Sequence, residues 1–63
     1  MKRGKEDQDM FTLYRNGKYR NEYFSLEAAI NTAQFVLTQA REYTVIVIRD
    51  KAGVEVWQGD NSR

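Results

Sequence analysis

The side chains that could do acid–base chemistry in this chain are carboxylates, lysines, tyrosines and hydroxyls, because the 63 residues include no Cys and no His. Without thiolate or imidazole groups, the common zinc sites and the Cys–His and Ser–His nucleophiles are excluded. The candidate carboxylates show no spacing that brings two of them into one pocket: Glu22, Glu27, Glu42, Asp50 and Glu55. We therefore expect a protein that is not an enzyme, with no catalytic residue, no metal and no cofactor.

The segment YRNGKYR combines cations with aromatic rings, which are the residue types that stack on and neutralise nucleic acids. The residues of this candidate nucleic-acid site are Tyr14, Arg15, Lys18, Tyr19 and Arg20. A basic turn also discourages pairing between sheet edges, and Lys plus Arg exceed Asp plus Glu only by 10 to 9 over the whole chain. Nucleic-acid binding is therefore the alternative function.

The same segment is predicted to lie in a β-hairpin. Residues 10–15 and 19–24 have strand composition, and Asn16-Gly17 between them is a strong hairpin signal. A two-residue turn would place charged side chains on the face of Phe11, whereas a three-residue loop with a bulge at Gly17 would not. We favour the three-residue loop.

That loop sets the pairing of the first hairpin. It pairs Leu13 with Tyr19 and Phe11 with Asn21, and it separates an apolar face from a polar one. The expected apolar face consists of Phe11, Leu13, Tyr19 and Tyr23.

A helix is predicted from Leu26 to about Arg41. Ser25 is a suitable N-cap, and Glu27 lies in the first turn, where the helix dipole favours an anion. Apolar residues at helical spacing form a stripe that we expect to face the core: Leu26, Ala29, Ile30, Ala33, Leu37 and Ala40.

The second predicted hairpin joins residues 43–49 to residues 54–58 through a turn that ends at Gly53. Counting back from the turn gives the pairs Arg49–Glu55, Ile48–Val56 and Val47–Trp57. On this register Ile46, Ile48, Val54 and Val56 face the helix. Val45, Val47 and Trp57 point away from it.

The order of elements predicts an α+β fold, a single ββαββ domain whose mainly antiparallel four-stranded sheet is covered by one helix on one face. The expected strand order is 2-1-3-4. The domain spans residues 10–58, between a disordered charged arm at 1–9 and a flexible tail at 59–63. The pattern resembles that of many small bacterial and phage-encoded ββαββ domains, a resemblance that carries no functional residue.

The outer side of the predicted helix is the first candidate contact surface. No charged residue occurs between Glu27 and Arg41, although an exposed helix face normally carries them. Phe35 lies opposite the core stripe, and its neighbours on that side include Ala28, Thr32 and Gln39. Interface cores lack charge and favour aromatic residues. The alternative interpretation is a single stray surface Phe.

The sheet face that the helix leaves uncovered is the second candidate surface. It would carry Val45, Val47 and Trp57, together with Tyr14. Alternatively, the arm or the tail covers this face, or the assignment of faces is inverted. Pairing of two such faces is the natural functional interpretation.

These surfaces predict a protein–protein interaction module. We expect a homodimer that binds another protein, with a phage or mobile-element protein acting on a host factor as one example that fits the size. We expect a cytoplasmic location because a secreted domain of this length more often carries disulfides. No membrane segment is expected, because the wholly aliphatic run Val45 to Ile48 is far too short.

Overall fold

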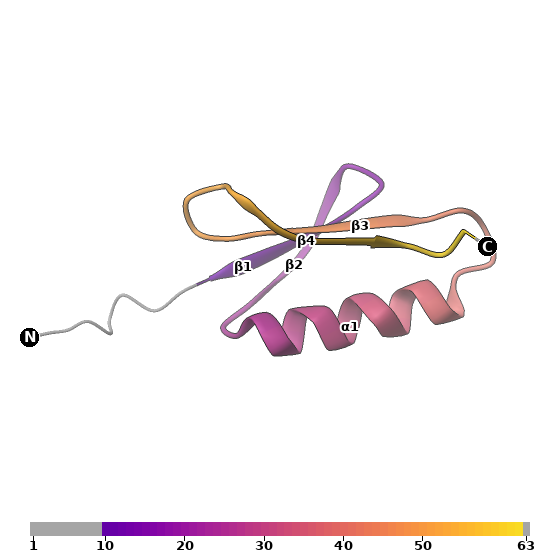
Figure 1. Cartoon of the computed structure of the whole chain (residues 1–63), viewed down its shortest axis with the longest axis horizontal. Coiled ribbons are helices and arrows are strands. Elements are labelled where there is room, and N and C mark those ends of the chain that lie inside the picture. Colours follow the sequence, from indigo (N-terminus) through magenta and orange to yellow (C-terminus); the bar gives the residue numbers. More distant parts are fainter. Residues whose placement is uncertain (1–9, 63) are drawn as a thin grey trace, which may run out of the picture.

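The computed structural model describes residues 10–62 as two layers, a four-stranded sheet and one helix packed against it (Figure 1). Along the chain the elements are β1 (Phe11–Arg15), β2 (Lys18–Tyr23), α1 (Leu26–Gln39), β3 (Val45–Arg49) and β4 (Glu55–Asp60). The strands pair antiparallel in the order β2-β1-β3-β4. The predicted fold and strand order are confirmed. The predicted arm, residues 1–9, lies outside the described residues.

Composition explains which strands take the centre of the sheet. β3 reads VIVIR and β1 reads FTLYR, and these two strands pair with each other in the middle. The edge strands, KYRNEY and EVWQGD, carry more charged and polar residues. Central strands have neighbours on both sides, so the more apolar sequences lose the most contact with water there.

The first hairpin closes through a two-residue turn. Asn16 and Gly17 both have positive φ, 52° and 83°, as a type I′ turn requires. Arg15 pairs with Lys18 and Tyr14 with Tyr19. The predicted three-residue loop with its bulge at Gly17 is therefore wrong.

Although the turn is tight, a bulge further along β2 keeps the apolar side chains on the core side of the hairpin. The register skips Arg20, so Leu13 pairs with Asn21 and Phe11 with Tyr23. Phe11 and Tyr23 thereby pack on the core side, as predicted. Tyr19 instead shares the outer face with its partner Tyr14 and is exposed.

α1 begins where the sequence predicts. The Ser25 side chain accepts a hydrogen bond from the Ala28 N–H at 3.1 Å. The helix ends at Gln39, because Ala40 takes extended backbone angles while its N–H still donates to the Val36 oxygen. The predicted end near Arg41 is therefore two residues too late. Val36, which is absent from the predicted stripe, also packs against the core.

The second hairpin also contains a bulge. Gly53 has φ 86° and donates to the Asp50 oxygen, which confirms the predicted turn. Arg49 pairs with Glu55 as predicted. The register then skips Val56, so Ile48 pairs with Trp57. The predicted pairs Ile48–Val56 and Val47–Trp57 are therefore wrong.

This bulge reverses the predicted faces of β4. Trp57 lies on the helix side, packed against the core, and not on the outer face. Val56, predicted to face the helix, is the skipped residue and is exposed instead, and Val54, which comes before β4 and the bulge, is exposed as well. Side chains alternate along a strand, so one inserted residue moves every later side chain to the opposite face.

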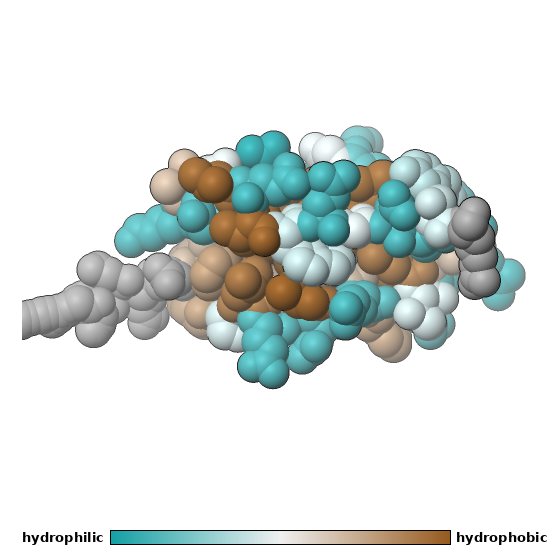
Figure 2. All heavy atoms as spheres, in the orientation of Figure 1, coloured by the Kyte–Doolittle hydropathy of each residue, from teal (hydrophilic) through white to brown (hydrophobic). Residues whose placement is uncertain are grey.

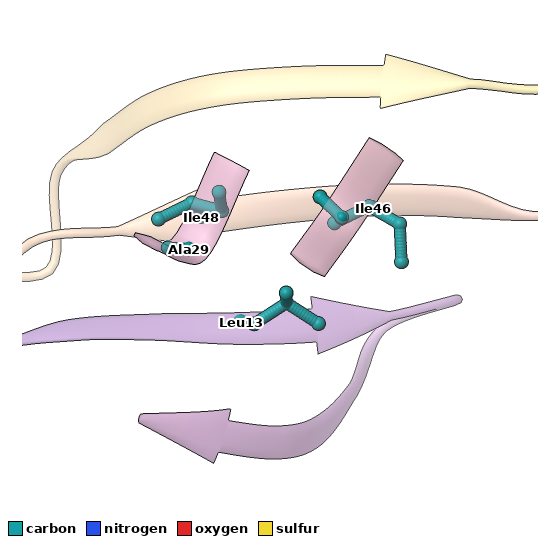
Figure 3. Close-up of a cluster of buried hydrophobic side chains, with 5 residues drawn as sticks. Leu13, Ala29, Ile46 and Ile48 are labelled. Carbon is teal, nitrogen blue, oxygen red and sulfur yellow. The ribbon is translucent and has the colours of Figure 1, made fainter. Parts of the chain in front are cut away.

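Five buried residues from three elements form the core (Figure 3). Leu13 of β1 and Ile46 and Ile48 of β3 point toward α1. Ala29 and Ala33, both 0% exposed, are the fully buried helix residues that meet them, and their small side chains let the helix approach the sheet closely. Figure 2 shows further apolar side chains between α1 and the sheet.

The ends of the last two strands differ from the prediction. β3 begins at Val45 and not at residue 43. β4 continues through Gly59 to Asp60, so the first residues of the predicted tail belong to the sheet. The helix found in the described residues has 14 residues and is too short to cross a membrane.

Candidate interaction surfaces

The outer helix face, defined as Ala28, Thr32, Phe35 and Gln39, is presented to solvent. Phe35 is 64% exposed, although a phenyl ring is strongly apolar. Ala28 and Gln39 are also exposed, and Thr32 is half-buried. The structure therefore brings together all four residues that the sequence predicts for this surface.

The helix geometry explains why this ring cannot reach the core. Phe35 follows the buried Ala33 by two positions, which is about 200° around an α-helix. Ala29 and Ala33 hold the opposite side of the helix against the sheet. Rotating Phe35 inward would pull these two alanines out of the core. The exposure of Phe35 is thus built into the periodicity of the helix.

Phe24 adds a second exposed aromatic ring at the N-terminal end of α1. It lies directly before the N-cap residue Ser25 and is 75% exposed. A ring at this position often packs on the first helical turns, but this one does not. One exposed phenylalanine, Phe24, therefore lies just before the helix, and the other, Phe35, lies within its uncharged part.

The outer sheet face presents a row of uncharged side chains across all four strands. In register, Tyr19 of β2 pairs with Tyr14 of β1, Tyr14 with Val47 of β3, and Val47 with Gln58 of β4. Tyr14 and Val47 are half-buried although α1, the helix found in residues 10–62, packs on the other face of the sheet. Val45 lies on the same face, next to this row, as predicted. Trp57, the third predicted member of this surface, lies on the other side of the sheet.

Arg49 lies beside the row on the same face. Its guanidinium carbon is 5.8 Å from the centre of the Tyr14 ring, within the range of a cation–π contact. The same side chain donates to the Gly53 oxygen at 3.0 Å, which fixes its direction. Tyr14, Val47 and Arg49 line a shallow hollow of about 370 Å³ with Gly17 and Gly53.

The residues of the candidate nucleic-acid site divide between two faces. Tyr14 and Tyr19 lie on the outer face. Arg15 and Lys18 pair with each other one position further along, so their side chains belong to the opposite face. Arg20 is the residue that the register skips. The tight turn therefore separates the aromatic rings from two of the three cations that the sequence groups together.

A groove of about 630 Å³ lies where the end of α1 meets the end of β4. Sequence reasoning missed it, because it joins segments that lie almost 20 residues apart. Its residues include Leu37, Arg41, Glu42, Tyr43, Asp60 and Asn61.

The Asn61 side chain holds the two sides of this groove together. Its Oδ1 accepts from the Thr44 N–H at 2.8 Å, and its Nδ2 donates to the Glu42 oxygen at 2.9 Å. Thr44 is completely buried, and its hydroxyl also donates to the Glu42 oxygen, at 3.0 Å. All these bonds satisfy backbone groups, so the polar side chains of this groove are explained by their role in holding the fold together.

Tyr43 also lines the groove. Its hydroxyl donates to Asp60 Oδ2 at 3.3 Å. The negative charge of Asp60 raises the pKa of Tyr43 above its usual value of 10.0, with smaller contributions from desolvation and from this hydrogen bond. The raised pKa keeps the phenol protonated and able to donate.

Within residues 10–62 there is no group of three or more acidic side chains that could hold a metal ion. The candidate carboxylates Glu22 and Glu55 lie on opposite edge strands.

Comparisons with known proteins identify no relative, so any functional conclusion must come from the surfaces described above. No family model, no curated protein and no solved structure matches this chain.

Proposed function

We propose that this protein is a small, non-enzymatic protein–protein interaction module that forms a homodimer through its outer helix face. The observation that carries the proposal is the 64% exposure of Phe35 on a helix with no charged residue between Glu27 and Arg41. Burying a phenyl ring is worth about 1.5–3 kcal/mol. Neutral neighbours add no desolvation penalty for charge, so a partner could cover this face at little cost.

The two strand edges favour association through a face and not through an edge. Both edge strands contain a bulge, at Arg20 in β2 and at Val56 in β4. Bulges interrupt the pattern of donors and acceptors that a further strand would need. β2 also carries Lys18 and Glu22, whose charges oppose edge pairing.

The uncovered sheet face leaves the dimer a second surface for another protein. Its row of Tyr19, Tyr14, Val47 and Gln58 contains no charge. A host factor bound by a phage or mobile-element protein is the kind of partner that the small size suggests. We place the module in the cytoplasm because the chain contains no Cys.

The experiment is a measurement of molecular mass by light scattering, with two variants that differ only in where they add a charge. We expect the native chain at about twice 7.4 kDa. Phe35→Glu should give a monomer, because a dimer would bury an unpaired carboxylate at a cost of several kcal/mol.

Gln34→Glu is the matched control. Gln34 is the exposed preceding residue, about 100° away around the helix, so this charge remains in water. The control should remain a dimer. A native chain that is monomeric at high micromolar concentration, or a Phe35→Glu variant that still forms the dimer, contradicts the proposal.

A further inference from the structure

We infer that the two copies pack their α1 helices antiparallel, around a two-fold axis between Asn31 and Thr32, with Phe35 of each copy against the partner's Ala28. This inference rests on the proposed function and specifies its geometry. It begins with the spacing of the outer helix face. Ala28 and Phe35 are seven residues apart, about 10.5 Å along the axis and only about 20° around it.

The size of the two side chains selects the antiparallel arrangement. A parallel pair would place Phe35 against the partner's Phe35 and Ala28 against the partner's Ala28, which crowds one site and leaves a void at the other. An antiparallel pair places each large side chain opposite a small one. Close packing with neither voids nor overlap is the usual condition for a stable interface.

The position of the axis agrees with the length of the helix. α1 runs from Leu26 to Gln39, so the midpoint of Ala28 and Phe35 lies within one residue of its centre. The two helices would therefore overlap over almost their full length. The same symmetry places Gln39 level with the partner's Phe24, whose ring is 75% exposed in one copy.

The lack of charge on the outer helix face favours a second copy of this chain as its binding partner. Glu27 is the acidic residue of the first turn, and α1 contains no basic residue in its last turn. A strongly charged partner would find no counter-charge on the outer helix face. A second outer helix face is neutral in the same way and offers the matching pair of large and small side chains.

Single-cysteine cross-linking tests the geometry, because the chain has no native Cys. In the antiparallel dimer, the two copies of residue 31 face each other across the two-fold axis, about 1.5 Å apart along the helices. Asn31 is exposed, so Asn31→Cys should leave the fold intact. Mild oxidation should convert this variant to a disulfide-linked dimer, since helix axes packed about 8–10 Å apart bring facing Cα atoms within the roughly 7 Å that a disulfide can span.

Gln39→Cys distinguishes the two helix directions. In the antiparallel dimer its two copies lie about 22 Å apart along the axis, too far for a disulfide, whereas in a parallel dimer they are adjacent. Gln34→Cys, on another side of the helix, measures random collision. We expect rapid cross-linking at residue 31 and only the collision level at residue 39.

The outcomes separate this inference from the proposed function. If Phe35→Glu dissociates the dimer and residue 39 cross-links above the collision level, whether or not residue 31 does, the dimer uses this helix but the antiparallel inference is wrong. A native dimer in which neither position cross-links above the level of Gln34→Cys also overturns it. A monomeric native chain overturns both.

Discussion

The Trp57 ring lies directly over the Cα of Gly59, on the helix side of β4. A Cβ at Gly59 would lie 2.6 Å from Cη2 of Trp57 and 3.2 Å from Cζ2 and Cζ3. The glycine therefore leaves space for the ring, which in turn packs against the core. The relationship exists only because the bulge at Val56 places Trp57 on this side of the sheet.

Gly59→Ala should destabilise the protein by displacing this ring. Overpacking of this kind costs about 1–3 kcal/mol in the free energy of unfolding. Urea unfolding gives this value, and the emission of the single Trp should move to longer wavelength in the folded variant. Gln58→Ala, at the exposed neighbouring position, is the control. An unchanged free energy and an unchanged emission for Gly59→Ala would show that the ring has room to move.

Asn61→Ala should loosen the groove between α1 and β4. It removes the acceptor of the Thr44 N–H and the donor to the Glu42 oxygen, and the loss is expected to be about 1–2 kcal/mol. Asn61→Asp keeps the acceptor but turns a charged oxygen toward the Glu42 oxygen, so it should not restore the stability. Urea unfolding and amide hydrogen exchange at Thr44 measure the effects. Ser62→Ala removes only an exposed bond to Asp60 and should be nearly neutral; equal stability of Asn61→Ala and Ser62→Ala would disprove the role of Asn61.

Asn16 should contribute to stability in two separable ways. Its φ of 52° is unfavourable for Ala, and its Oδ1 accepts from the Val45 N–H at 2.9 Å. Asn16→Gly removes only the hydrogen bond and should cost about 1 kcal/mol. Asn16→Ala adds about 1–2 kcal/mol of backbone strain. Thermal unfolding of both variants tests this order, and an Ala variant as stable as the Gly variant contradicts it.

Tyr43 should make the stability fall at alkaline pH. Because Asp60 raises the pKa of Tyr43 in the folded state, the contribution of the protonated phenol is complete below the unfolded pKa near 10. It is then lost as the pH rises through the folded pKa. Urea unfolding as a function of pH should therefore show a steeper decline for the native chain than for Tyr43→Phe.

Asp60→Asn provides the control for the cause of that shift. The amide still accepts the hydrogen bond but carries no charge, so the pKa of Tyr43 should move back toward its usual value. Ultraviolet absorbance of the tyrosinate reports the titration. A pKa that stays equally high in Asp60→Asn would assign the shift to burial and not to charge.

Local sequence determined the elements and the exposure of the helix surface. Ser25 caps α1, and the helical spacing of Ala29 and Ala33 on one side and Phe35 on the other decides which side chains are buried. Such features depend on residues within a few positions of one another, so one sequence suffices to predict them. The strand order follows from composition, because the two more apolar strands, β1 and β3, lie at the centre of the sheet.

The tertiary structure alone decided the registers and hence the composition of the sheet faces. The positions skipped by the register, Arg20 and Val56, have no marker in the sequence, because a bulge satisfies the packing of a whole face and not a local preference. It is this packing that turns Trp57 inward and Tyr19 outward. The contact of Asn61 with Glu42 and Thr44 could not be predicted from the sequence either, since it forms only when the end of β4 meets the end of the helix.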